Sequence, residues 1–268
     1  MSWRLGLSTG VCTHCPIADI VPPIAQSGVA GIEIGTPPEH FDPRQETQIS
    51  TLGQLLERTS IEAVSIHAPF GSRLDLAASD PQSRQAGVDA IGAATRALKR
   101  LGGRLVVAHP SDLPRHGQDA HARVHDAMLS LSEVAENCRR ERMTLVVESP
   151  LPHLIGGHPR EFAWILGQLD DSVRVCLDTG HTALGQHWHR FLDAAGSRLI
   201  HVHANDNYGH HDDHLPPGTG IIDWREIVRS LKEAHFGGWI MLELACPAGD
   251  RTAFFRSAVE RAQKLLVP

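Results

Sequence analysis

The chain has 268 residues, of which 41% are hydrophobic and 21% are charged, and this composition is ordinary for a protein with a sizeable core and argues against intrinsic disorder. The net charge of −6, with histidine neutral, argues against a protein that binds polyanions through lysine and arginine. We expect one domain over residues 1–268, because α/β barrels of this length form a single unit.

The N-terminal segment lacks a basic stretch followed by a long apolar run, and no segment approaches 18 uninterrupted apolar residues. We therefore expect a cytoplasmic protein without a membrane partner. Five cysteines, an odd number, argue against a disulfide framework. Cys12 and Cys15 form a lone CxxC pair, which we interpret as two small loop residues rather than a metal or redox site.

Eight short apolar runs, rich in β-branched residues, alternate with helical patterns along the chain. The runs cover residues 4–8, 31–35, 63–67, 104–109, 144–148, 173–178, 199–203 and 239–243. Near-continuous hydrophobic runs are typical of parallel strands that are buried on both faces. Their alternation with helices predicts a series of βαβ units.

Helix signals lie between these runs. A predicted helix over residues 81–101 begins after Asp80, a suitable N-cap, and another covers residues 119–141. Asp223 caps a third that ends before Gly237, and residues 250–266 form the last. An open, doubly wound sheet is the alternative. Eight units, with no GxGxxG after the first run, favour a single (β/α)₈ TIM barrel.

Six of the eight predicted strands end on a residue that can bind a metal ion. These residues are His67, His109, Glu148, Asp178, His203 and Glu243. A lone histidine at a strand end is more often a satisfied buried group. Strand ends of a barrel meet at one mouth, however, and carboxylates gathered there are costly without a cation. The pattern predicts a divalent-metal site with Glu148, Asp178, His203 and Glu243 as core ligands.

Two loops add further donors to this end of the barrel. His181 follows Asp178 by three residues, and the segment 209–214 contains Asp212 and His214. A solvated surface loop explains that segment equally well. The mixture of imidazole and carboxylate suits zinc, manganese, cobalt or iron better than calcium, and magnesium is the remaining candidate.

The same segments resemble a known superfamily across essentially the whole chain. They are residues 65–69, 108–110, 147–149, 177–181, 201–206, 212–224 and 242–243. In this order, at these strand ends, they resemble the xylose-isomerase-like barrels. That superfamily includes sugar isomerases and epimerases, inosose-type dehydratases and apurinic-site endonucleases of the endonuclease IV type.

The resemblance implies two sets of metal ligands. Glu148, Asp178, His203 and Glu243 match the ligands of the single catalytic metal in the ketose epimerases. The residues His67, His109, His181, Asp212 and His214 match the ligands that complete a three-zinc cluster in the endonucleases. The chain looks complete for both, so the resemblance alone leaves two reaction types open.

We favour a metal-dependent isomerase or epimerase of carbohydrate metabolism that acts on a small sugar or related polyhydroxy carbonyl compound. Glu148 and Glu243 would move a proton at the carbon next to the carbonyl, unless both are ligands only. The alternative is an endonuclease IV-type metal-dependent phosphodiesterase. Acidic residues outnumber arginines in the predicted mouth loops, which disfavours nucleic acid as a partner. A metal-loaded binding module without catalysis is the third hypothesis.

The predicted mouth loops also bear on the kind of substrate. No glycine-rich phosphate loop follows the last two strands, and the segment 246–250 is acidic, so we expect an unphosphorylated substrate. Phe70, Trp188 and Tyr208 fall in predicted mouth loops, where they would either cover a sugar face or pack within a lid. The sequence is compatible with a homo-oligomer and leaves the number of metal ions undefined.

Overall fold

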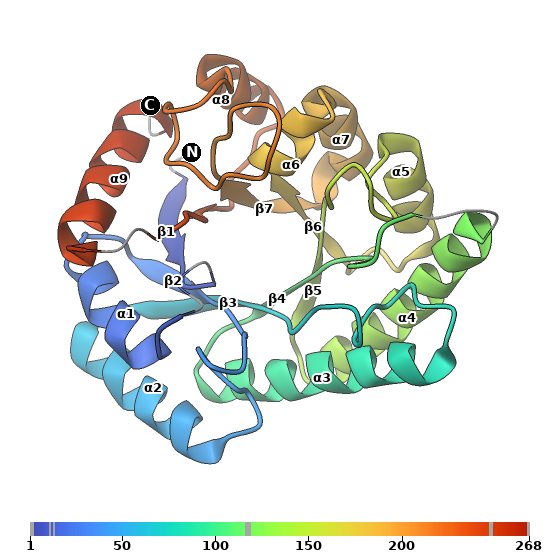
Figure 1. Ribbon diagram of the computed structural model, residues 1–268, viewed down its shortest axis with the longest axis horizontal. Coiled ribbons are helices and arrows are strands. Elements are labelled where there is room, and N and C mark those ends of the chain that lie inside the picture. Colours follow the sequence, from blue (N-terminus) through green and yellow to red (C-terminus); the bar gives the residue numbers. More distant parts are fainter. Residues whose placement is uncertain (1–2, 11, 13, 116–118, 247–248, 267–268) are drawn as a thin grey trace.

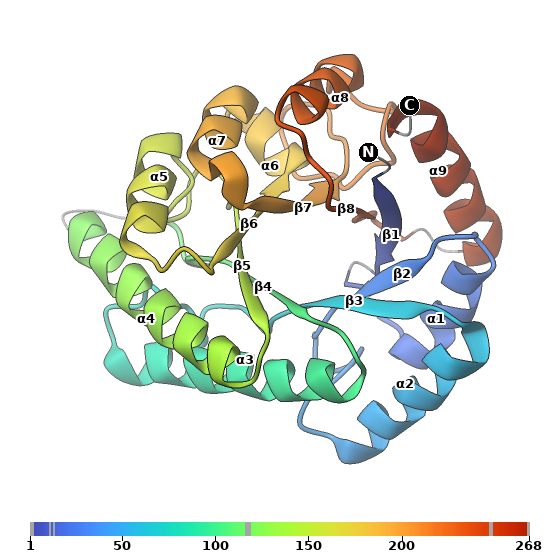
Figure 2. The same ribbon diagram turned by 180° about the vertical axis from the view of Figure 1, so that it is seen from behind.

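The computed structural model describes residues 3–10, 12, 14–115, 119–246 and 249–266. Eight parallel strands close into a barrel in sequence order, with β1 paired to β8. The helices form a ring around these strands (Figure 1), and Figure 2 shows the same ring from behind. The predicted (β/α)₈ barrel is confirmed. Across the ranges that the structure describes, no helix is long and apolar enough to cross a membrane.

Strands and helices alternate along the chain. The strands are β1 (Arg4–Ser8), β2 (Gly31–Ile34), β3 (Glu62–His67), β4 (Leu105–Ala108), β5 (Thr144–Glu148), β6 (Arg174–Asp178), β7 (Leu199–Ala204) and β8 (Trp239–Leu242). The helices are α1 (Ile17–Ala25), α2 (Glu46–Thr59), α3 (Pro81–Arg100), α4 (Ala120–Arg140), α5 (Pro159–Gln168), α6 (Thr179–Leu184), α7 (Trp188–Ala195), the 3₁₀ turn η1 (Gly196–Arg198), α8 (Trp224–Glu233) and α9 (Arg251–Leu266).

The observed elements agree closely with the expected ones. Asp80 caps α3 by accepting from the amides of Gln82 and Ser83, and Asp223 caps α8 in the same way. Strands β4 and β8 end one residue earlier than expected, so His109 and Glu243 are the first residues after their strands. Both still lie at the carboxyl edge of the barrel.

Inside the barrel, apolar layers lie below the polar mouth. Side chains of a strand alternate between its two faces, so every second residue points inward. Two clusters separate from the main core fill the interior: Val64, Trp239 and Met241, and then Val107, Val146 and Cys176. Glu148 follows Val146 by two positions and Asp178 follows Cys176 by two, so both belong to the layer above. The main core lies between strands and helices.

The long loop between β7 and α8 carries part of the predicted site and is organised by Asp206. This buried carboxylate accepts hydrogen bonds from Trp224 Nε1 at 2.8 Å and from the amides of Gly218 and Ile222 at 2.9 and 3.1 Å. A short antiparallel bridge joins Asp206 to Leu215. These bonds tie the loop to the start of α8, so its position over the barrel mouth is fixed.

Replacing Asp206 with alanine should lower the free energy of unfolding by about 3 kcal/mol, because several buried donors lose their acceptor together. Urea unfolding of the purified protein measures this change. Asp213→Ala on the same loop is the control, since Asp213 accepts only from the exposed Tyr208 amide among the contacts described. Equal stability of the two variants would contradict the role given to Asp206.

Candidate metal centre

Four carboxylate and imidazole side chains meet at the ends of β5, β6, β7 and β8. Glu148, Asp178, His203 and Glu243 each offer a ligand atom within 4.8 Å of the others. The Nδ1 atom of His203 lies 3.1 Å from Glu148 Oε1, 3.3 Å from Glu243 Oε2 and 4.0 Å from Asp178 Oδ2. All four residues are buried. The structure thus brings together the four residues predicted as core ligands.

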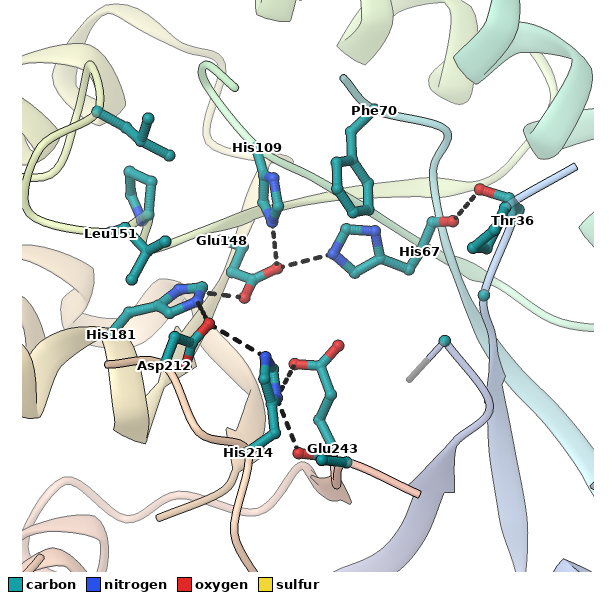
Figure 3. Close-up of a pocket in the computed structure, with 16 residues that line it drawn as sticks. Thr36, His67, Phe70, His109, Glu148, Leu151, His181, Asp212, His214 and Glu243 are labelled. Atoms are coloured by element: carbon teal, nitrogen blue, oxygen red, sulfur yellow. Dashed lines mark hydrogen bonds and ion pairs between the residues drawn. The ribbon is translucent and has the colours of Figure 1, made fainter. Parts of the chain in front are cut away.

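A second group shares Glu148 with the first. His67 Nε2 and His109 Nε2 each lie 3.1 Å from Glu148 Oε2, while Glu148 Oε1 faces His203. Figure 3 shows the two imidazoles reaching this carboxylate from neighbouring strands. Each oxygen of Glu148 therefore belongs to a different cluster of nitrogen and oxygen atoms.

A third group lies beside the first two. Asp212 Oδ2 is 3.2 Å from His181 Nε2 and 3.1 Å from His214 Nε2 (Figure 3). His181 Nδ1 also lies 3.7 Å from Glu148 Oε1, which connects this group to the centre. All nine residues predicted as ligands therefore surround one mouth, including the two from the 209–214 segment.

The five imidazoles share one arrangement. One ring nitrogen faces the carboxylates of the centre, and the other lies within 3.2 Å of a second oxygen acceptor. The acceptors are Ala68 O for His67, Asp112 Oδ1 for His109, Ser149 O for His181 and Glu243 O for His214, and His203 Nε2 lies 3.0 Å from Glu33 Oε1 as an ion pair. Metal-binding histidines almost always have such a partner, which fixes the ring and leaves the inner nitrogen free for the ion.

Glu33 and His201 complete a buried layer beneath the centre that the sequence did not single out. Glu33 Oε1 lies 3.0 Å from His203 Nε2, and Glu33 Oε2 lies 3.2 Å from His201 Nε2 and accepts from Ser65 Oγ at 2.8 Å. All four side chains are buried. The available signals were a glutamate inside an otherwise apolar strand and a histidine two positions before His203 on the same strand face.

The protein groups alone have an excess of buried negative charge. Burial raises the pKa of Asp178 to about 6, and the carboxylates of Asp212, Glu148 and Glu243 act in the same direction, against His181. The crowded carboxylates therefore resist full ionisation unless positive charge lies close to them.

The same carboxylates raise the pKa values of neighbouring imidazoles and so favour their protonated form. Burial disfavours the cationic form of His181, yet Asp178 and Asp212 raise its pKa to about 9. His214 behaves alike, and Asp212 and Glu243 raise its pKa to about 10. The centre thus attracts cations, either protons on imidazoles or a metal ion. Its oxygen and nitrogen donors fit a divalent transition metal.

The centre opens into a cavity of about 450 Å³, within the range of small-molecule sites. Phe70, Pro150, Leu151 and Leu154 form its apolar wall, and neither lysine nor arginine lines it within the described parts of the chain. The Phe70 ring lies 5.1 Å from the His67 ring, centroid to centroid.

The other two predicted mouth aromatics do not line this cavity. Trp188 begins α7, is buried, and donates from Nε1 to Ser230 Oγ of α8 at 2.8 Å, so it packs between helices. Tyr208 is exposed on the β7–α8 loop. The expectation of an acidic segment at 246–250 includes Pro247 and Ala248, which lie outside the described residues.

Comparisons with known proteins find a family and several similar proteins. Residues 21–265 match the family model of the xylose isomerase-like TIM barrel. The uncharacterized protein MJ1311 of Methanocaldococcus jannaschii is 28% identical over 251 residues, which cover 91% of this chain and 84% of that protein. Fructoselysine 3-epimerase of Escherichia coli O157:H7 is 31% identical over 77 residues, 28% of each chain. A crystal structure of a D-tagatose 3-epimerase-like protein matches with a TM-score of 0.84 and 24% identity over 98% of both chains.

Replacing Glu33 with glutamine should weaken divalent-metal binding by about 10- to 100-fold, because His203 loses the carboxylate that orients its ring. Competition with a chromophoric chelator measures the dissociation constant. Glu62→Gln, at the exposed start of β3, is the matched control. An unchanged constant in a folded Glu33 variant would show that His203 is positioned without this contact.

The protein stripped of metal by a chelator should lose stability as pH rises from about 6.5 to 9. The pKa values of His181 and His214 are near 6.5 when unfolded but about 9 and 10 when folded, so the folded state binds more protons in this window. This stabilisation is complete below about pH 6.5. Added zinc or manganese should abolish the decline, because the ion replaces the protons. Parallel urea-unfolding profiles with and without metal would contradict a metal centre.

Proposed function

Because the chain belongs to the xylose isomerase-like TIM barrel family, we propose that it is an isomerase or epimerase that uses a divalent metal ion. Its substrate would be a small sugar or related polyhydroxy carbonyl compound. The observation that carries the proposal is a pair of buried glutamates, Glu148 and Glu243, on either side of His203 Nδ1 at a cavity with an apolar wall. The similarity to fructoselysine 3-epimerase and to a D-tagatose 3-epimerase-like protein supports the same reaction class.

Glu148, Asp178, His203 and Glu243 would hold the ion, with zinc, manganese, cobalt and magnesium as candidates. When bound, the ion would polarise the carbonyl and adjacent hydroxyl of the substrate and make the neighbouring C–H bond more acidic. Asp178 suits a purely binding role, because its Oδ1 accepts from the His181 amide at 2.7 Å and its Oδ2 from Asn205 Nδ2 at 2.8 Å.

The two glutamates differ in their freedom to move protons. In the part of the chain that the structure describes, Glu243 Oε1 has no hydrogen-bond partner, so Glu243 is placed to accept a proton from substrate carbon. Despite burial, His203 and His109 hold the pKa of Glu148 well below its usual value. A proton returned on that side would therefore come through His67 or His109, which contact Glu148 Oε2.

The cavity wall supports a neutral, unphosphorylated substrate. Phe70, Leu151 and Leu154 offer apolar surface to the C–H face of a sugar, and the polar groups of the centre face its hydroxyls. A phosphate group would need cationic or amide donors, and no described lining residue is lysine or arginine.

A phosphodiesterase is the second candidate, favoured by the second and third groups of donors. His67 and His109 with Glu148, and His181 and His214 with Asp212, would allow more than one ion to clamp a phosphodiester. The charge around the mouth opposes this candidate. Two arginines of the mouth loops are paired with carboxylates, Arg44 with Asp42 and Arg115 with Glu161.

Incubation with ketoses or cyclitol ketones in heavy water tests the proposed function. The metal-loaded enzyme should introduce deuterium at the carbon next to the carbonyl, detected by NMR or mass spectrometry. Glu243→Gln should reduce exchange and turnover by about 10²- to 10⁴-fold. Glu39→Gln, an exposed glutamate in the β2–α2 loop, is the matched control and should keep full activity.

Cleavage of abasic duplex DNA by a protein with three ions per chain, without exchange on any sugar, would replace this proposal with the phosphodiesterase. Metal binding without turnover in either assay would instead favour a binding module. Isomerisation without deuterium uptake would keep the substrate class and indicate a hydride shift.

A further inference from the structure

Three of the five cysteines lie together outside the metal centre, at the seam where the barrel closes. Cys12 and Cys15 belong to the loop after β1, and Cys246 belongs to the loop after β8. Strands β1 and β8 are hydrogen-bonded neighbours (Figure 2), so the loops that follow them leave the barrel from adjacent strands. The structure therefore gives the CxxC pair a third thiol that is remote in sequence.

The thiols and one arginine contact each other directly. The Cys12 thiol is buried, with 3% exposure, and is hydrogen-bonded to Cys246. Arg251, the first residue of α9, donates from a terminal guanidinium nitrogen to Cys15 Sγ at 2.8 Å and also hydrogen-bonds Cys246. Cys15 and Cys246 are partly exposed. Cys246 is thus a partly exposed sulfur that contacts both the Arg251 guanidinium and the Cys12 thiol. Such an arrangement favours oxidation of the two thiols to a disulfide.

We propose that Cys12 and Cys246 form a redox-sensitive pair that a hydroperoxide converts into a disulfide across the barrel seam. Cys246 sulfur attacks one peroxide oxygen, the O–O bond breaks, and a sulfenic acid and water are formed. Cys12 sulfur then attacks the Cys246 sulfur, the S–O bond breaks and a second water leaves. Two thiols are oxidised and one hydrogen peroxide is reduced to two waters.

The order of the two steps follows from the surroundings of each sulfur. Cys246 is reachable from solvent and lies beside Arg251, whose charge stabilises negative sulfur during the attack. Burial, together with the neighbouring Cys246 thiol, raises the pKa of Cys12. Cys12 is therefore the thiol that resolves the sulfenic acid rather than the one that meets the oxidant.

The disulfide would restrict the two loops that line the cavity beside β1 and β8. Gly10 precedes Cys12 by two positions and Ala245 directly precedes Cys246, and both line the cavity of the metal centre. A bond between the loops would fix the spacing of these two lining segments. It would also close a covalent loop containing nearly the whole chain, which strongly reduces the freedom of the unfolded state.

The test treats the full-length protein, with its metal as isolated, with hydrogen peroxide and stops the reaction with catalase. Free thiols are then alkylated, and unreduced peptides are analysed by mass spectrometry. We expect a peptide pair joined through Cys12 and Cys246, reversed by dithiothreitol, and a melting temperature several degrees above that of the reduced protein. Cys138 and Cys176, buried elsewhere, serve as internal controls and should remain thiols.

Matched variants separate this pair from the adjacent CxxC pair. Cys15→Ser should still form the cross-link, whereas Cys246→Ser and Cys12→Ser should lose both the cross-link and the rise in melting temperature. Arg251→Leu should slow oxidation on the order of tenfold, and Arg251→Lys should restore much of the rate. A Cys12–Cys15 disulfide in the wild type, or fully alkylated Cys12 after peroxide treatment, would overturn the proposal.

Discussion

Three carboxylates are buried around one imidazole nitrogen at the mouth of the barrel, and the surrounding residues compensate their charge. Glu148, Asp178 and Glu243 surround His203 Nδ1, and none of them is substantially exposed to water. Buried like charges are strongly unfavourable unless a cation compensates them. The neighbouring imidazoles either carry protons for this purpose or give way to a metal ion. The pKa values of His181 and His214 are raised for the same reason, because the nearby carboxylates stabilise the protonated imidazoles.

The barrel meets this demand through its register. Inward positions recur at every second residue, so a strand can place an apolar side chain in one layer and a ligand in the next. Val146 and Glu148 on β5 follow this rule, as do Cys176 and Asp178 on β6. The layer that contains Glu33 and His201 then supports the ligands from below. The same strands therefore carry the apolar side chains of the barrel interior and the buried carboxylates of the mouth.

The sequence predicted the barrel and the gathering of these polar side chains at its mouth, because both follow from local patterns. A polar residue that ends an apolar run, as Glu148 and Asp178 do, marks the mouth without knowledge of the neighbouring strands. The contact between Glu33 and His203 depends on how β2 and β7 face each other across the barrel, which no local pattern contains. The same reason explains why Cys246 was not associated with Cys12, and why Trp188 was expected at the mouth although it packs between α7 and α8.

The two oxygens of Glu148 connect the question of reaction type to the number of ions. If Oε1 and Oε2 each bind an ion, one with His203 and the other with His67 and His109, both oxygens of Glu148 are held by cations and the carboxylate becomes a weak proton acceptor. A single ion on the His203 side leaves Oε2 in contact with two imidazoles that can supply protons. Proton transfer at a substrate carbon is therefore favoured by a single bound ion, whereas hydrolysis of a phosphodiester is favoured by more than one. Among the described residues that line the cavity there is no lysine or arginine to assist a phosphodiester, which supports the one-ion arrangement of the proposed function.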